Sequence, residues 1–197
     1  MKLHCIRHAQ SVANQQGVIS CVFPGAEVSE VGTSQIQELS QTSLPWDKDI
    51  SIISSPFLRT LQTAQGICNQ DRLLVDFRIQ ELDLGSFHGQ KYDDVKQEIK
   101  DQLAQGAAGN LEVRFGGDGE TQRTYLGRVY LFLHDVILDN QDVVVVTHEC
   151  IVSTIHQFHR ELYGGEPTKV TNCSILSLEF QLEDLEHLKK NLERVSL

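Results

Sequence analysis

Five short apolar runs, each bounded by charged or turn-forming residues, predict the strands of a sheet. They cover residues 2–6, 49–55, 73–77, 142–147 and 174–180. The fourth run reads "DVVVVT", and an unbroken row of valines is typical of a central strand that is covered on both faces. The sequence therefore predicts a sheet that lies between two layers of helices.

Between these runs, apolar residues recur with the spacing of helices. Ser29 is the expected N-cap of the first of them. Alternating strands and helices predict a three-layer α/β/α sandwich with a mostly parallel central sheet, and 197 residues suit one domain, 1–197. The expected helices cover 29–41, 57–69, 91–104, 120–139, 149–163 and 183–193.

The segment 89–120 differs from the rest because it is polar, has glycines at both ends and contains no strong strand pattern. Long excursions between the strands of a small domain are commonly functional. We predict that this segment is a surface lid between the third and fourth strands. The alternative is a simple helical crossover.

Charge and cysteine content narrow the class of protein. The formal net charge of −10 disfavours binding to nucleic acid or to anionic membranes. The longest apolar stretch, 142–148, is too short to cross a bilayer, and the first residues lack the apolar core of a signal peptide. The 5 cysteines are odd in number and form no CxxC pair, as in reduced cytosolic proteins. We expect a cytoplasmic protein.

Candidate chemistry gathers where the predicted strands end. The first strand is followed by Arg7 and His8, the second leads to Arg59, the third to Glu81 and the fourth to His148. Ligands of open α/β sheets bind beyond the carboxyl ends of the strands. We therefore expect these five side chains to meet at one edge of the sheet.

Such a set of side chains suits phosphoryl transfer. Two guanidinium groups match the oxygens of a phosphoryl group. A neutral imidazole is a competent nucleophile toward phosphorus when its second nitrogen donates to a carbonyl. A carboxyl group can protonate the leaving oxygen and then deprotonate a water. None of these steps requires a metal or another cofactor, so we expect neither.

The segment "RHAQSVAN" (7–14) resembles the Arg-His-Gly-x-Ser/Thr-x-x-Asn signature of the histidine phosphatase superfamily, in its phosphoglycerate mutase-like branch. Four further segments resemble motifs of that family in the same order, and together they span most of the chain. They are "SSPFLRTLQTA" (54–64), "ELDLGSFHG" (81–89), "GGDGET" (116–121) and "VVVVTHE" (143–149). The resemblance implies a phosphoglycerate mutase-like fold and a small phosphatase.

The resemblance also implies roles for the five side chains. His8 would attack the phosphorus and become a phosphohistidine. Arg7, Arg59 and His148 would bind the three phosphoryl oxygens, while Glu81 would act as general acid and then as base. Asp83 and Glu120 are nearby alternatives for the proton donor. Within the first motif, Asn14 would contact the phosphoryl group or the substrate, and Ser11 would order the loop.

We therefore expect a metal-independent phosphomonoester hydrolase acting on a small phosphorylated metabolite. A phosphoglycerate mutase and a catalytically silent protein that binds phosphorylated ligands remain alternatives, and the substrate and oligomeric state stay open. Candidates for substrate selection are the rim aromatics and basic residues Phe23, Phe87, Tyr92, Phe115, Lys91 and Arg114.

Three further positions carry expectations that the structure can test. Glu149 follows His148 where glycine is usual in the family, and we expect its side chain to point away from the pocket. Asn172 is expected to cap a turn, and the alternative is that it reaches the rim of the active site. The histidine pair of "HQFH" (156–159) lacks further ligands at fitting spacing, so we predict no metal site there.

Overall fold

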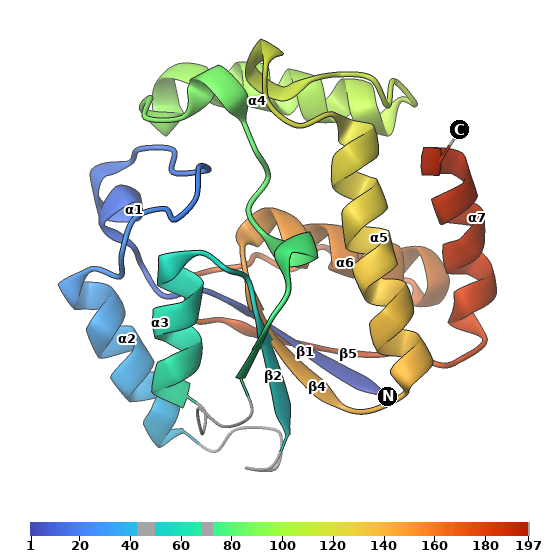
Figure 1. The fold of residues 1–197 in the computed structure, drawn as a ribbon, viewed down its shortest axis with the longest axis horizontal. Coiled ribbons are helices and arrows are strands. Elements are labelled where there is room, and N and C mark those ends of the chain that lie inside the picture. The colour runs from blue at the N-terminus through green and yellow to red at the C-terminus, as the bar shows by residue number, and fades with distance from the viewer. Residues whose placement is uncertain (43–49, 68–72, 197) are drawn as a thin grey trace.

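Helices pack on both faces of a five-stranded sheet in the computed structural model, which describes residues 1–42, 50–67 and 73–196 (Figure 1). The strand order is β3-β2-β4-β1-β5, and only β5 runs antiparallel to its neighbour. The predicted α/β sandwich with a mostly parallel sheet is thus confirmed. The strands are β1 (Lys2–Arg7), β2 (Ser51–Ser54), β3 (Leu73–Val75), β4 (Val143–Thr147) and β5 (Ile175–Glu179).

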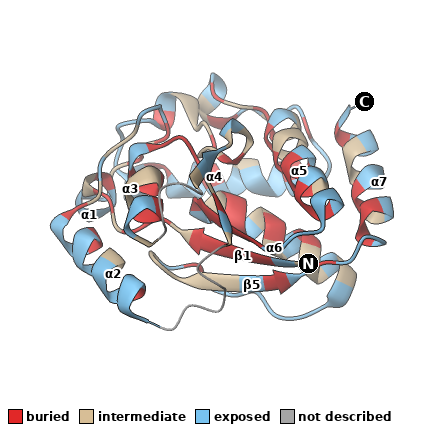
Figure 2. Cartoon of the chain, turned by 60° about the horizontal axis from the view of Figure 1, so that its bottom comes forward, coloured by how far each residue is buried: buried red, intermediate tan, exposed pale blue. Residues whose placement is uncertain are grey.

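The valine-rich strand β4 lies in the middle of the sheet, and all of its residues are buried. Its neighbour β1 is also buried over most of its length, as the red ribbon at its label in Figure 2 shows. Val143 and Val145 belong to the larger of the two sheet cores, whereas Val144 and Val146 belong to the smaller one. Successive side chains of a strand point to opposite faces, so an all-valine strand supplies apolar surface to both helical layers.

One helical layer contains α2 (Glu30–Gln41) and α3 (Leu58–Ile67), which contribute Leu39 and Ala64 to the smaller core. The other contains α5 (Gln122–Asp139), α6 (Glu149–Tyr163) and α7 (Asp184–Ser196), whose apolar residues enter the larger core.

The predicted N-cap at Ser29 is confirmed, because its side chain accepts a hydrogen bond from the Gly32 amide. The short helix α1 (Val12–Gln16) was not predicted, since 5 residues give no periodic pattern. The predicted ends at residue 49 and at 68–69 lie outside the described residues.

The segment 89–120 forms α4 (Tyr92–Ala107) and a 3-10 turn, Phe115–Gly117. Helix α4 lies apart from the sheet, at the top of Figure 1. Its Val95 and Ile99 pack in a separate small cluster with Ile19, from the segment after α1. This helix therefore covers that segment rather than a face of the sheet.

Among the described residues, no helix combines the length and apolar character needed to cross a membrane. Cys5, Cys21, Cys150 and Cys173 are free thiols. Cys68 lies outside the described part of the chain.

Candidate active site

The two candidate histidines lie next to each other because they follow neighbouring parallel strands. Strands β1 and β4 pair in register, with Arg7 opposite Thr147. The His8 amide continues this ladder by donating to the Thr147 carbonyl at 2.9 Å. His8 and His148 consequently emerge at the same edge, with ring centroids 5.3 Å apart.

His8 is held in one orientation and one tautomer. Its Nδ1 lies 2.7 Å from the Ala9 carbonyl oxygen, which can only accept, so Nδ1 carries the proton. Its Nε2 then carries a lone pair, which accepts from Arg59 Nε at 3.0 Å. Burial, together with the nearby Arg59 and His148, holds the pKa of His8 well below its usual range. The ring is therefore neutral at pH 7.

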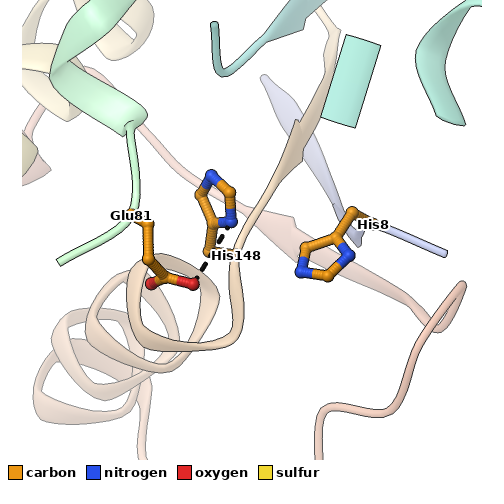
Figure 3. Close-up of side chains that lie close together, drawn as sticks. All are labelled: His8, Glu81 and His148. Carbon is orange, nitrogen blue, oxygen red and sulfur yellow. Dashed lines mark ion pairs between the residues drawn. The ribbon is translucent and has the colours of Figure 1, made fainter. Parts of the chain in front are cut away.

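Arg59 links the members of the site. Besides its bond to His8, its Nη2 lies 3.2 Å from Glu81 Oε2 and 3.1 Å from His148 Nδ1. The same Glu81 oxygen lies 3.3 Å from His148 Nδ1, the pair joined by the dashed line in Figure 3. His8, Glu81 and His148 offer ligand-type atoms within 4.8 Å of one another. The guanidinium group already lies among them as the local cation.

Burial and charge set the protonation of the other two groups. Burial lowers the pKa of His148 to about 4, although Glu81 opposes the shift. Its Nε2 is hydrogen-bonded to the Ser55 hydroxyl at 2.8 Å. Burial alone would raise the pKa of Glu81, but His148 and Arg59 outweigh it and hold that pKa below its ordinary value. Without a ligand, Glu81 is therefore ionised and His148 neutral.

Two guanidinium donors of the site are buried without a hydrogen-bond partner among the described residues. They are Arg7 Nε and Arg59 Nη1. A buried donor without an acceptor is energetically costly and uncommon in folded proteins. Both donors are therefore available to an anionic acceptor that enters the site.

The structure also separates Glu81 from the two alternative carboxyl groups. Asp83 accepts a hydrogen bond from the Gly85 amide at 2.9 Å. Glu120 pairs with Arg128, with 2.7 Å between its Oε1 and Arg128 Nε. Of the three, Glu81 is the one that contacts Arg59 and lies beside His148.

The side chains of Ser11 and Asn14 form hydrogen bonds with backbone amides at the start of α1. The Ser11 side chain accepts from the Asn14 amide at 3.2 Å, and Asn14 Oδ1 accepts from the Ser11 amide at 3.1 Å, which makes a capping box. No hydrogen bond joins either side chain to His8 or Arg59 in the part of the chain that the structure describes.

Two expectations about orientation were wrong. Glu149 does not simply point away: its side chain is 56% exposed, but Oε2 lies 2.7 Å from Arg7 Nη1. The nearby guanidinium attracts the carboxylate back toward the site. Asn172 donates from Nδ2 to the His8 carbonyl at 2.8 Å. It reaches the site because the next residue, Cys173, donates its amide to the Arg7 carbonyl at 3.0 Å.

Comparison with known proteins identifies the family. The family model described as histidine phosphatase superfamily (branch 1) matches residues 3–192, nearly the whole chain. The chain belongs to this superfamily. It is a phosphatase of the superfamily, with the phosphoglycerate mutase-like fold.

One similar protein is a relative from Hydrogenobacter thermophilus that is named as a candidate phosphoserine phosphatase 2. It is 28% identical over 153 residues, which cover 75% of this chain and 72% of the relative. The crystal structure of a phosphoserine phosphatase from Entamoeba histolytica matches with a TM-score of 0.70 and 24% identity, over 89% of both chains. The alpha-ribazole phosphatase from Shigella flexneri matches with a TM-score of 0.71 and 19% identity, over 92% of this chain and 91% of the other.

Sequence reasoning missed three residues that support the site of this histidine phosphatase. Ser55 binds His148, as described above, and Thr63 Oγ1 accepts from the Ala9 amide at 3.0 Å. Both lie in the segment "SSPFLRTLQTA", so the motif was found but their partners were not. Gly25 has φ +75°, and a Cβ there would lie 2.6 Å from Arg59 Nη1. Its missing side chain leaves room for the guanidinium group.

The rim candidates divide into buried and exposed residues. Phe87 and Phe115 are buried, so they were wrongly expected at the rim. Apolar contacts in their own clusters explain this burial. Tyr92 is exposed, as is Phe23, which packs edge-on against Phe57 near the site. Phe57 in turn contacts His148 and Arg59, so Phe23 is the rim aromatic connected to the site.

The basic residues Lys91 and Arg114 are bound to backbone carbonyls. Lys91 Nζ donates to Gln16 and Arg114 Nη1 to Gly119. Each group keeps further N–H donors beyond this bond, so the bonds fix where the two side chains lie without excluding a contact with an anionic group.

Arg128 fixes the backbone that carries Glu81. Its guanidinium donates to the carbonyls of Arg78, Gln80 and Glu81 at 2.6–3.2 Å and pairs with Glu120. We expect Arg128→Ala to lower the free energy of unfolding by about 3–5 kcal/mol, since it leaves a nearly buried carboxylate unpaired. Urea unfolding followed by circular dichroism measures this. Lys189→Ala, which breaks an exposed pair on α7, is the control, and equal stabilities of the two variants would contradict the prediction.

Proposed function

We propose that this protein is a metal-independent phosphomonoester hydrolase that works through a phosphohistidine on His8. One observation carries the proposal: His8 Nδ1 lies 2.7 Å from the Ala9 carbonyl oxygen and donates its proton to that hydrogen bond. The lone pair of the ring is therefore on Nε2, the nitrogen that lies beside Arg59. A buried, neutral imidazole in this orientation is a nucleophile that needs no separate base.

In the first step, the substrate phosphoryl group enters between His8 and the two arginines. Its oxygens accept from donors of Arg7, Arg59 and His148, among them the buried Arg7 Nε and Arg59 Nη1 that lack partners. A phosphoryl oxygen takes over the Arg59 Nε donor, which frees the His8 Nε2 lone pair. That lone pair forms a bond to phosphorus while the bond between phosphorus and the ester oxygen breaks. The proton of Glu81 passes to that oxygen, and the alcohol leaves.

In the second step, ionised Glu81 takes a proton from a water, whose oxygen attacks the phosphorus of the phosphohistidine. The phosphorus–nitrogen bond breaks, its electron pair returns to His8 Nε2, and inorganic phosphate leaves. The guanidinium donors stay on the three equatorial oxygens in both steps, where they stabilise the transition-state charge.

The protonation of Glu81 follows from the same geometry. In the free protein, Arg59 and His148 favour its ionised form. A phosphoryl group bound to Arg59 places negative charge beside the carboxylate and draws the guanidinium donors to itself. Both effects raise the pKa of Glu81, so substrate binding prepares the general acid.

The substrate that we propose is a small phosphorylated metabolite. The Hydrogenobacter thermophilus relative is named for phosphoserine, and the Entamoeba histolytica enzyme was crystallised with 3-phosphoglyceric acid. Phosphorylated hydroxy acids of this size are the first compounds to assay. We propose the segment 89–120 as the lid over the bound substrate, because its Tyr92 amide donates to Gly17 and joins the segment to the loop after α1.

A screen over phosphorylated metabolites, with a chelator present and with His8→Ala alongside, tests the proposal. Wild type should release phosphate in the chelator, and His8→Ala should lose at least about a hundredfold in turnover. Activity that survives in the variant, or that needs an added divalent ion, would contradict the mechanism. Transfer between 2- and 3-phosphoglycerate without phosphate release would favour a mutase instead.

A further inference from the structure

A carboxylate lies next to one of the arginines that we assign to phosphoryl binding. Arg7 Nη1 is 2.7 Å from Glu149 Oε2 and donates to the Val170 carbonyl at 2.9 Å. The two acceptors hold this end of the guanidinium, while its Nε, buried without a partner in the described chain, remains available to an anion. Glu149 also directly follows His148 along the chain.

The two ends of this pair differ in exposure. The side chain of Arg7 is 17% exposed, whereas that of Glu149 is 56% exposed. An ion pair with one end in solvent contributes little to the free energy of unfolding, so a role in stability does not account for this pair. Its effect on the binding of a neighbouring anion is larger than its effect on stability, because the carboxylate and the anion would share one guanidinium charge.

We propose that Glu149 is an internal competitor of phosphate for Arg7, and that it keeps the affinity for substrate and for product phosphate low. The proposal rests on the proposed function, in which Arg7 binds the phosphoryl group. Glu149 does not touch the reacting atoms in this account. It acts through Arg7 and is a positioning and affinity-setting residue.

The competition affects binding rather than chemistry. The phosphoryl group carries its negative charge in the bound substrate, in the transition state and in product phosphate alike. A carboxylate nearby therefore disfavours all of these states by similar amounts. An effect of this uniform kind changes KM and the inhibition constant of phosphate but leaves kcat nearly constant.

Glu149→Gln tests the proposal, because glutamine keeps an oxygen acceptor for Arg7 and removes the charge. KM and the inhibition constant of inorganic phosphate should each fall about fivefold, the effect of one partly screened charge at short range. The value of kcat should stay within about twofold of wild type. Glu186→Gln, which removes a charge from an exposed pair with Lys189 on α7, is the matched control and should change neither constant.

The outcomes separate this inference from the function on which it rests. If wild type is active through His8, and Glu149→Gln binds phosphate no more tightly than wild type, the inference is overturned alone. An equal fall in the Glu186→Gln control would overturn it too, because the effect would then come from net charge. A wild type without His8-dependent phosphatase activity would instead overturn the proposed function.

Discussion

Replacing Arg59 by alanine is expected to lower kcat/KM by at least about a hundredfold. This side chain donates to His8 Nε2 at 3.0 Å and contacts both Glu81 and His148. Its loss removes the cation that contacts His8, Glu81 and His148 and, in the proposed mechanism, donors to the phosphoryl group. Both substrate binding and the stabilisation of the transition state should suffer, so kcat should fall as well as kcat/KM.

Two further variants make the Arg59 result interpretable. Arg59→Lys keeps the charge but not the forked donors, and we expect it to recover only a small part of the activity. Arg123→Ala removes an arginine of α5 that pairs with Glu112 away from the site, and it should retain wild-type turnover. Initial rates on the best metabolite of the screen measure all three. Near-normal activity of Arg59→Ala would contradict the assigned role.

The second large effect is expected for Glu81→Gln, and it depends on the leaving group. Glutamine cannot transfer a proton, so turnover of an alkyl phosphate should fall by about a hundredfold or more. For p-nitrophenyl phosphate, whose leaving group departs as a stable anion, the first step should be much less affected. A burst of p-nitrophenol followed by slow turnover is expected, because hydrolysis of the phosphohistidine still needs the base.

Asp83→Asn is the matched control for Glu81→Gln. Its carboxylate accepts from the Gly85 amide and lies two residues from Glu81, and its loss should leave turnover close to that of wild type. Stopped-flow absorbance at the p-nitrophenolate band measures the burst and the steady state. A larger loss in Asp83→Asn than in Glu81→Gln would exchange the roles of the two residues.

The sequence predicted the sheet and the meeting of four side chains, those of His8, Arg59, Glu81 and His148, for one physical reason. Strands that are apolar on both faces lie in the interior of an α/β sandwich, and parallel neighbours end at the same edge. His8 and His148 follow β1 and β4, so their proximity depends on strand pairing alone. Arg59 is the second residue of α3, and its guanidinium contacts His8 at the same edge.

What the sequence could not predict depends on contacts between distant loops. Glu149 is drawn to Arg7 and Asn172 to the backbone of His8, and neither contact has a periodic signal. The need for glycine at position 25 arises from the place of the Arg59 guanidinium, which tertiary packing sets. The burial of Phe115 likewise reflects the larger core and not its position in a polar segment.

The central claim is that His8 becomes phosphorylated during turnover. Wild type mixed with a 32P-labelled substrate should be quenched in base, in which phosphohistidine survives and phosphoserine is lost, and then digested for mass spectrometry. The account predicts label on the peptide that contains His8, a larger labelled fraction in Glu81→Gln because hydrolysis is slow there, and none in His8→Ala. Phosphate release without any labelled histidine, or label on another residue, would contradict it.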